Sequence, residues 1–392
     1  MNKVVIVSAT RTAIGKFGGS LKDIAPGQLG SVVLKDALKR VDVDPAEVEE
    51  VIMGNVLSGG QGMNIARQSS IWGGIPIKVP AFSVNMVCGS SLKSVILGAQ
   101  SIMVGDEEVV LAGGTESMST ARYALAKARW GIRMGNDEIV DMMINDGLWD
   151  IFNNIHMGVT AENLAEKYNI SREEQDEFAA KSQNKAEAAI KEGRFKDEIV
   201  PVPVPQPKGE PLLFDTDEFP RSGTTKETLA KLKPAFKKGG TVTAGNSSGI
   251  NDGAAAVLLM SEDKAKEMGL RPMATIVSYA YCGVSPEIMG IGPVCAASTA
   301  LSRANLTTDD IDLIEENEAF AAQSIAVDRE LRWDPERVNV NGGAIALGHP
   351  IGASGSRILV TLLYGLMRRK GKYGLATMCI GGGMGIAVII KR

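Results

Sequence analysis

The sequence predicts an α/β fold in which a strand-and-helix unit occurs twice, with a segment of different character inserted between the copies. Three observations predict this class. Apolar runs of strand length alternate with amphipathic helical patterns in the first third of the chain, and the alternation returns in the last third. Short stretches of the first third resemble stretches of the last third in the same order. With 392 residues, 44% of them hydrophobic, the chain can bury a large core in two or three domain-sized units.

Strands and helices alternate through the first third. Residues 4–7, 50–53 and 109–111 are apolar runs typical of buried strands. Residues 28–40 and 90–103 have the periodicity of helices. The second helix places its apolar residues on one face: Leu92, Val95, Ile96, Ala99, Ile102 and Met103. The alternation predicts a sheet with helices on its faces.

The last third repeats this order. Strands are predicted at 274–277, 312–314, 337–340 and 375–378, and a helix at 353–368. Residues 51–55 resemble 313–317, residues 83–85 resemble 339–341, and residues 111–118 resemble 377–384. These matches keep their order at nearly constant separation, which predicts a duplicated α/β unit with a site between its halves.

Residues 119–241 break the pattern. Residues 171–192 are a charged, Ala-rich helix in which Ser171 and Glu174 have the spacing of a capping box. Residues 201–211 are Pro-rich, so this stretch is expected to be extended or looped, and a connector is its simplest interpretation. The middle segment is therefore predicted to be an inserted domain of mixed structure.

Composition argues against several classes of protein. The formal net charge is −4 and no long basic run occurs, so nucleic-acid binding has little support. The apolar stretches fall short of the ~20 residues that cross a bilayer, and the N-terminus lacks the regions of a signal peptide. Four cysteines in so long a chain are no disulfide framework, so we expect a reducing cytoplasm. The cysteines and the two histidines lack metal-site spacing, so no metal is expected.

Cys88 lies where a strand-like run gives way to the helix of residues 90–103. A thiol at a helix N-terminus faces unpaired N–H groups and the positive end of the helix dipole, and both favour the thiolate. This context predicts a reactive cysteine. A buried structural cysteine is the alternative that the local context leaves open.

His349 lies in a glycine-rich stretch, residues 341–355. Glycines allow the backbone to lie close to a ligand, so the histidine is a candidate base or hydrogen-bond donor. A histidine fixed in a turn for packing is the alternative.

Cys379 ends a strand-like run and opens the stretch Cys-Ile-Gly-Gly-Gly-Met-Gly. Exposed N–H groups of such a loop can form an oxyanion hole. Phosphate binding is a rival interpretation, although neither a P-loop nor an early GxGxxG pattern is present. Asn317, in the stretch Asn-Glu-Ala-Phe of residues 317–320, could hold a water molecule or donate to an oxyanion; a helix cap is the commoner role of such an Asn.

Together these four segments resemble the thiolase family, most closely its biosynthetic branch, which forms acetoacetyl-CoA from acetyl-CoA. The resemblance runs from residues 9–12 to the final strand. One departure is Ser91, where many relatives carry Gly. The resemblance implies a five-layered α/β/α/β/α body. Its halves would be residues 1–118 with 242–270, and residues 271–392. Residues 119–241 would be a loop domain for coenzyme A binding and tetramer contacts.

The resemblance also implies site residues. Cys88 is similar to the acyl-carrying nucleophile, His349 to the group that accepts its proton, and Cys379 to the base that deprotonates the second acetyl-CoA. Asn317, through a water molecule, and His349 would stabilise the oxyanion of that substrate, and the N–H groups of Cys88 and Gly381 would stabilise the oxyanion of the acyl-enzyme. Further residues match coenzyme A contact positions: Leu148, His156, Met157, Arg221, Ser248, Ala319 and Phe320.

Some of these assignments have simpler alternatives. Arg221 could be a solvated surface residue, and Met157 could be ordinary core filler rather than the residue that shortens the acyl pocket.

The coenzyme A thioesters are substrates, so no cofactor is expected. The expected partners are acetyl-CoA, acetoacetyl-CoA and free CoA, with a homotetramer joined near residues 122–141. Cys88 and Cys379 must reach one substrate carbon, so an oxidant could link them as a disulfide.

Three other activities remain open. A degradative 3-ketoacyl-CoA thiolase would use the same chemistry on longer chains. A ketosynthase is less favoured because it uses two histidines with its cysteine, and this chain offers only His156 besides His349. A non-catalytic acyl-CoA or lipid-binding protein would lack the reactive groups that this chain retains.

Overall fold

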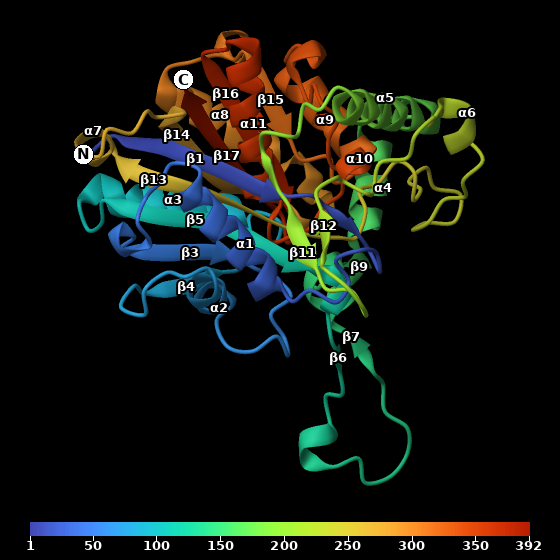
Figure 1. Ribbon diagram of the computed structural model, residues 1–392. Coiled ribbons are helices and arrows are strands. Elements are labelled where there is room, and N and C mark those ends of the chain that lie inside the picture. The colour runs from blue at the N-terminus through green and yellow to red at the C-terminus, as the bar shows by residue number, and fades with distance from the viewer.

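Nine strands form the main path of an 11-stranded sheet in the computed structural model, which describes residues 1–392 (Figure 1). Their order across the sheet is β15-β16-β17-β14-β1-β13-β5-β3-β4. The strands are β1 (Val4–Thr12), β3 (Glu50–Gly54), β4 (Ala81–Val84), β5 (Val109–Ser117), β13 (Asn251–Ser261), β14 (Ala274–Gly283), β15 (Leu313–Glu316), β16 (Tyr373–Ile380) and β17 (Met384–Lys391). All predicted strands except 337–340 are present, most of them longer than predicted.

The pairing directions show the duplication. From β1 outward, the pairs β1–β13 and β13–β5 are antiparallel and the pair β5–β3 is parallel. From β14 outward, the pairs β14–β17 and β17–β16 are antiparallel and the pair β16–β15 is parallel. The matched sequences of β3 and β15, and of β5 and β16, therefore occupy equivalent places. The two halves meet where β1 pairs with β14 through two register positions.

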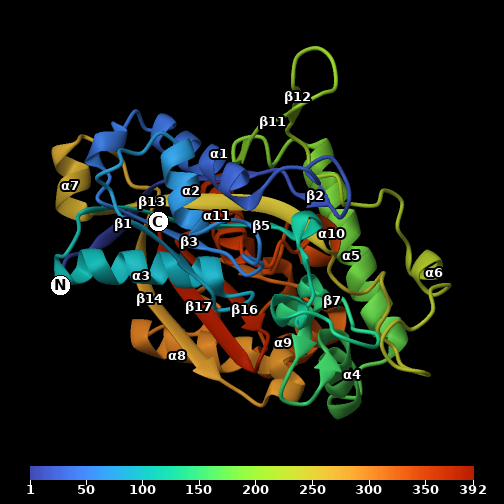
Figure 2. The ribbon, with the colours of Figure 1, turned by 90° about the horizontal axis from the view of Figure 1, so that it is seen from below.

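Helices complete five layers (Figure 2). The outer face of the first half is covered by α1 (Pro26–Lys39) and α2 (Ile65–Trp72), and the outer face of the second by α8 (Gly292–Ala304) and α9 (Ala321–Leu331). Between the halves lie α3 (Ser90–Val104) and α11 (Ser354–Arg369). Leu92 and Ile96 of α3 share one buried cluster with Ile358 and Leu362 of α11 and with strand residues from both halves. Both halves thus bury their inner faces against one pair of helices.

The stretch Val87–Val104 is long and apolar enough to cross a membrane by length and composition. This corrects the expectation that every apolar stretch is too short. The stretch consists of α3 and the residues before it, and it lies between the two halves of the sheet. Its apolar character is explained by burial on more than one side.

The predicted strand at 337–340 is wrong. Residues Pro335–Arg337 form a short 3-10 helix, and Val338 makes only an isolated bridge to Ile314. Asn339 has a φ of +45°, which no strand residue adopts. Its side-chain amide instead accepts from the Glu316 N–H (2.9 Å) and donates to the Glu316 carbonyl (2.8 Å). A side chain therefore takes the hydrogen bonds that a further strand would have made to β15.

Cys282 at the end of β14 and Cys295 in α8 are joined as a disulfide, with Cα atoms 6.4 Å apart. One local bridge is not the disulfide framework that the cysteine count argues against. The two residues lie in neighbouring elements of the second half, which composition alone does not reveal. Cys88 and Cys379 remain free.

The middle segment supplies the projecting parts of the molecule. The predicted helix is α5 (Arg172–Lys191), and its Ser171–Glu174 capping box is confirmed. The Pro-rich stretch forms one side of a hairpin, β11 (Val202–Val204) with β12 (Leu212–Phe214). The middle segment also contains β6 (Tyr123–Ala124), β7 (Val140–Asp141), β8 (Trp149–Asp150), β9 (Ile155–His156), β10 (Ile199–Val200), α4 (Met157–Lys167) and α6 (Lys226–Leu229). The short elements β2 (Gly15–Lys16), α7 (Glu262–Glu267) and α10 (Ala344–Leu347) lie outside it.

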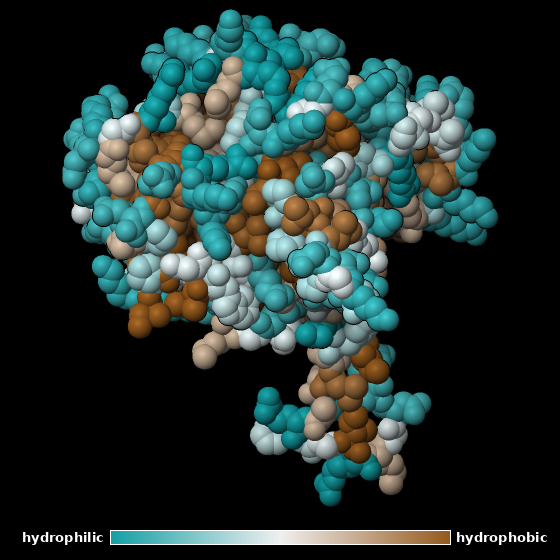
Figure 3. All heavy atoms as spheres, viewed as in Figure 1, coloured by the Kyte–Doolittle hydropathy of each residue, from teal (hydrophilic) through white to brown (hydrophobic).

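An arm extends from the body between the paired strands β6 and β7 (Figure 1). Figure 3 shows hydrophobic side chains along this arm. The exposed ones include Tyr123 (66%), Trp130 (85%), Met134 (97%) and Ile139 (65%). So large an exposed apolar surface on a projection is typical of a protein contact.

A buried ion cluster fixes the middle segment to the first half. Arg11 of β1 donates to Glu198 (2.6 Å) and, through two nitrogens, to Asp217 (2.8 and 2.9 Å). All three side chains are almost inaccessible to solvent. Removal of one partner would leave a buried charge unpaired, so this cluster holds the insert in one position over the body.

Candidate active site

Cys88 follows β4 immediately before α3. Val87 has a φ of +46°, so the chain turns sharply, and the Ser90 hydroxyl bridges the turn by accepting from the Met86 N–H (2.8 Å) and donating to the Val87 carbonyl (2.6 Å). The backbone N–H groups of Gly381 and of Cys88 itself act to lower the pKa of the Cys88 thiol. Burial nevertheless raises the pKa of the thiol to about 11. The expected lowering of this pKa is therefore wrong for the free protein, because desolvation exceeds the effect of the N–H groups.

Cys379 ends β16 and is 1% exposed. Burial raises the pKa of its thiol well above the ordinary value, and the neighbouring Cys88 and Glu316 raise it further. The side chain packs in a small cluster with Met157, Met289 and Phe320. Cys379 is thus a thiol that keeps its proton in the free protein.

The Cys88 and Cys379 segments are in direct contact. A Cβ atom on Gly89 would overlap the Ile380 side chain, so this position has room only for glycine. A Cβ atom on Gly381 would lie 3.3 Å from Val87 Cγ1 and 3.4 Å from Met157 Sδ. The glycines beside both cysteines therefore permit the close approach of two segments that are almost 300 positions apart.

His349 reaches the same region from the second half. Its backbone N–H donates to Asn251 Oδ1 (2.9 Å), and its ring nitrogen Nδ1 lies 2.6 Å from Ser354 Oγ. The other ring nitrogen, Nε2, lies 3.5 Å from Asn317 Nδ2. Burial lowers the pKa of the imidazole to about 3, and the nearby Arg357 lowers it further. The ring is therefore neutral at physiological pH.

Asn317 connects β15 to this site. Its N–H donates to the Thr377 carbonyl (3.0 Å), and continuing the register of β15 with β16 places it one residue from the level of Cys379. Asn317 is fully buried, and its Oδ1 atom has no hydrogen-bond partner. A buried carbonyl oxygen without a partner is suited to a water molecule or a substrate donor.

A cavity of about 620 Å³ leads from the surface to His349. Six of the predicted coenzyme A contacts line it: Leu148, His156, Met157, Arg221, Ser248 and Phe320. Ala319 does not line it, but its carbonyl accepts from the Ser248 N–H (3.0 Å) and so holds the loop that does. Cys88 and Cys379 are not among the lining residues. Cys88 packs against a cluster that contains the lining residues Met118 and Ile351, and Cys379 packs in a cluster with the lining residues Met157 and Phe320.

Aromatic rings form one wall of this cavity. The His156 ring stacks on Phe236 with centroids 4.8 Å apart, and Phe236 meets Phe320 edge to face at 6.2 Å. His156 Nδ1 accepts from the Gly158 N–H (3.0 Å) at the start of α4, and burial lowers the pKa of this imidazole. Arg221 stands exposed at the rim, with its guanidinium 5.6 Å from the Phe219 ring. An apolar wall with a cation at its mouth suits a long ligand with an anionic end.

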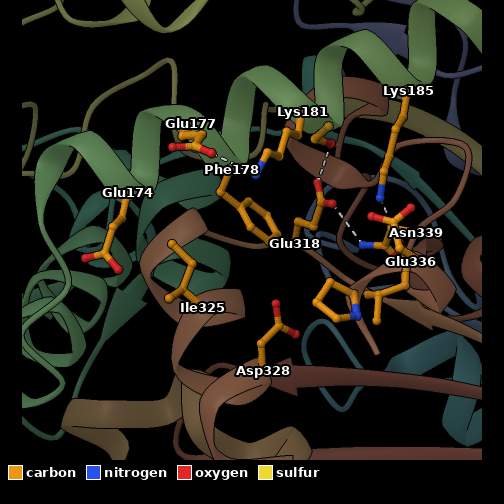
Figure 4. A pocket seen from close by; sticks show the side chains of 13 residues that line it. Glu174, Glu177, Phe178, Lys181, Lys185, Glu318, Ile325, Asp328, Glu336 and Asn339 are labelled. Carbon is orange, nitrogen blue, oxygen red and sulfur yellow. Dashed lines mark hydrogen bonds and ion pairs between the residues drawn. The ribbon is translucent and has the colours of Figure 1, made fainter. Parts of the chain in front are cut away.

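A second cavity, of about 440 Å³, lies between α5 and α9 (Figure 4). Among the sequence-predicted site residues, none lines it. Glu318 borders it with its carboxylate bonded to Ser182 (2.7 Å) and Asn339 (2.9 Å). No group of three or more His, Cys, Asp or Glu side chains has the arrangement of a metal site.

Several residues that hold the site were missed by sequence reasoning. Glu116 accepts from the N–H groups of Val56, Leu57 and Gly352, so it joins a first-half loop to the His349 loop. Asn251 and Ser354 hold the backbone and the ring of His349. The only sequence signal for these residues was Glu116 itself, a carboxylate in the predominantly apolar strand β5.

Comparison with known proteins agrees with this geometry. The N-terminal thiolase domain matches residues 4–263, and the C-terminal thiolase domain matches residues 270–392. An acetyl-CoA acetyltransferase from Pseudomonas aeruginosa is 62% identical over 392 residues, covering 100% of both chains. One from Cupriavidus necator is 61% identical over the same length.

Solved structures are similar over the whole chain. The Bacillus anthracis acetyl-CoA acetyltransferase has a TM-score of 0.98 at 48% identity and covers 100% of this chain and 99% of its own. The human mitochondrial 3-ketoacyl-CoA thiolase in complex with CoA has a TM-score of 0.95 at 48% identity and covers 100% of this chain and 98% of its own. With both thiolase domains matched end to end and its fold shared with these enzymes, the chain belongs to the thiolase family.

Proposed function

We propose that the protein is an acetyl-CoA C-acetyltransferase, which condenses two acetyl-CoA molecules to acetoacetyl-CoA and CoA and catalyses the reverse thiolysis. One observation carries the proposal: two free thiols from the two halves of the fold lie in touching segments, and both pack in clusters with residues that line a cavity reaching His349. The names of the full-length relatives support the substrate.

In the first half-reaction, His349 Nε2 accepts the Cys88 proton, and the thiolate attacks the carbonyl carbon of acetyl-CoA. The N–H groups of Cys88 and Gly381, which favour negative charge on the sulfur, would donate to the oxyanion that forms. Each such donor contributes ~3–4 kcal/mol to transition-state stabilisation. The bond between the acyl carbon and the CoA sulfur then breaks, leaving acetyl-Cys88.

The leaving CoA thiolate takes the proton of Cys379 and departs as CoA. The raised pKa of Cys379 matters for the next step, because the thiolate left behind is a strong base. It removes a proton from the methyl carbon of a second acetyl-CoA. His349 and a water molecule on Asn317 stabilise the enolate oxygen. The carbanion attacks the carbonyl carbon of acetyl-Cys88, and the bond between that carbon and the Cys88 sulfur breaks. Acetoacetyl-CoA leaves, and His349 returns its proton to the Cys88 thiolate.

The pantetheine arm would lie along Ser248 against the wall of His156, Phe236 and Phe320, with the nucleotide near Arg221. We therefore propose residues 119–241 as the loop domain that binds coenzyme A. Met157 limits the acyl chain, because its sulfur lies at the Gly381 loop behind the reacting atoms.

A degradative 3-ketoacyl-CoA thiolase is the second candidate, because the human enzyme of that name shares the fold. The position of Met157 favours short chains. Thiolysis of acetoacetyl-CoA should be faster than thiolysis of a long-chain 3-ketoacyl-CoA by more than tenfold. Replacing Met157 with Ala should narrow this ratio, whereas Met134→Ala on the arm should not change it.

Trapping the intermediate tests the proposal. Acetyl-CoA mixed with the protein should give a burst of free CoA and an acetylated peptide containing Cys88. The Cys88→Ser variant should give neither. A wild-type protein that stays unacetylated and releases no CoA would instead be a binding protein.

We propose that the enzyme is a cytoplasmic homotetramer whose dimers meet through the arm between β6 and β7.

The contact between the Cys88 and Cys379 segments also supports a reversible disulfide under oxidation. Inactivation by oxidant should be reversed by a thiol, and mass spectrometry of the inactive protein should find Cys88 linked to Cys379. Free thiols in that sample would eliminate the disulfide.

A further inference from the structure

Ser354 is the first residue of α11, and its hydroxyl makes two close contacts. Its Oγ atom lies 2.6 Å from His349 Nδ1 and 2.9 Å from the Pro350 carbonyl oxygen. Ser354 is fully buried and His349 is 5% exposed, so water does not compete for either contact.

The Pro350 carbonyl also accepts from the N–H groups of Ala353 (2.8 Å) and Ser354 (3.0 Å), and only one arrangement places a proton in both hydroxyl contacts. A hydroxyl carries one proton, and a carbonyl oxygen carries none. The contact between the Ser354 and Pro350 oxygens therefore requires the hydroxyl proton, since two oxygen lone pairs would otherwise face each other. The contact with His349 must then contain the Nδ1 proton. This assignment comes from the hydrogen-bond network, as a tautomer must.

The other ring nitrogen fits the same assignment. With its proton on Nδ1, the neutral ring has an unprotonated Nε2, which faces the Asn317 Nδ2 amide at 3.5 Å. We propose that Ser354 is a positioning residue that fixes His349 as the Nδ1–H tautomer and so keeps Nε2 free to accept the Cys88 proton. The kinetic part of this inference rests on the proposed function; the tautomer does not.

A neutral hydroxyl has a further consequence for the chemistry. A carboxylate at this place would stabilise the imidazolium ion and hold the proton, as in serine hydrolases. Ser354 orients the ring without adding a negative charge. The imidazolium therefore holds the Cys88 proton while the sulfur is acylated and returns it readily when the thiolate is released.

Ring-nitrogen NMR of protein labelled with ¹⁵N-histidine tests the assignment directly, because the chain has only two histidines. His156 Nδ1 accepts from the Gly158 N–H, so His156 carries its proton on Nε2 and serves as an internal reference. At neutral pH the wild type should show one Nδ1–H ring and one Nε2–H ring. Two Nε2–H rings would overturn the proposal.

Variants of Ser354 distinguish a role in positioning the His349 ring from a role in folding. In Ser354→Ala the Nδ1–H ring should become a mixture of tautomers, while the His156 signals stay unchanged. The CoA burst should slow by at least ~10-fold with KM changed by less than about twofold, since the ring loses its orientation rather than a substrate contact. Ser354→Thr keeps the hydroxyl and should restore both the ring signature and the burst.

Ser356→Ala is the matched control. Its buried hydroxyl lies in the same helix and bonds the Ala353 carbonyl (3.0 Å) without contacting His349. Both rings and the burst should keep their wild-type behaviour. A Ser354→Ala protein with an unaltered Nδ1–H ring and burst would refute the role of Ser354. A wild type with the expected rings but no burst would refute the proposed function and leave the tautomer assignment standing.

Discussion

Gly348 holds the backbone at a φ of +105° beside His349, and a Cβ atom there would overlap the Asn251 side chain. Asn251 is also the acceptor for the His349 N–H. Gly348→Ala should therefore displace the histidine loop and reduce the CoA burst by more than tenfold. It should also lower the free energy of unfolding by more than the ~1–2 kcal/mol of left-handed strain alone. Burst kinetics and urea denaturation measure the two effects.

Gly74→Ala is the control for backbone strain. Gly74 has a φ of +86°, and a Cβ atom there would meet nothing within 4 Å. The free energy of unfolding of this variant should fall only by the cost of the left-handed backbone, and its CoA burst should equal that of the wild type. Equal losses in the two variants would show that strain, rather than the contact with Asn251, explains the effect at Gly348.

His349 should make the protein sensitive to acid. Burial lowers its pKa from the ordinary 6.5 to about 3, so between these pH values the folded protein binds fewer protons than the unfolded chain. Unfolding then takes up a proton, and falling pH destabilises the fold by up to ~1.4 kcal/mol per pH unit. His349→Gln should lose less stability than the wild type between pH 7 and pH 4, as measured by urea midpoints.

His156→Gln provides the comparison. Burial also lowers the pKa of His156, but this ring is only half-buried, so its replacement should change the acid sensitivity less. If the His349 and His156 variants lost stability with pH as steeply as the wild type, other groups would be responsible for the acid sensitivity.

At the scale of elements, the side chain of Asn339 completes β15. It makes two hydrogen bonds to the Glu316 backbone and one to the Glu318 carboxylate (2.9 Å). Asn339→Ala should lower the free energy of unfolding by ~2–4 kcal/mol, because buried groups on β15 lose their partners. Thermal denaturation measures this loss, and the burst should fall because Glu318 adjoins Asn317.

Asn305→Ala is a matched change, since Asn305 also has a positive φ (+54°) but is exposed at the end of α8. It should cost less than about 1 kcal/mol. A similar loss in both variants would mean that the left-handed backbone at Asn339, and not its side-chain bonds to β15, accounts for the effect.

Asn339 also illustrates a feature of the fold that the sequence pattern does not predict. Strands and helices with a regular apolar pattern, such as β1 and α3, could be predicted because burial on one or both faces sets the pattern. The run at 337–340 has the apolar residues of a strand, but its Asn side chain makes the hydrogen bonds. His349 and Cys379 could be selected as candidates by their glycine-rich surroundings, and Cys88 by its place between a strand-like run and a helix. Glu116 and Asn251 could not, because their roles depend on which loops the fold brings together.

At the scale of the whole molecule, duplication explains why the site lies where it does. Cys88, the proposed nucleophile, precedes α3 in the first half, and His349 precedes α11 in the second. Because α3 and α11 pack against each other between the halves, their N-terminal ends meet at the same place. The insert supplies the cavity wall above that place, so the catalytic groups and the substrate contacts come from different parts of the chain.

The arm gives the last prediction. Ala124 pairs with Val140, so residues 125–139 can be replaced by a two-residue Asn-Gly turn without changing the paired strands. The change removes most of the exposed apolar surface of the arm, including Trp130 and Met134. Sedimentation should then show dimers in place of tetramers. The burst should persist, because none of the residues removed lines the cavity. Shortening the β11–β12 hairpin, by joining residues 204 and 212 through the same turn, should leave the tetramer intact. A tetramer that survives removal of the arm would show that its dimers meet through another surface.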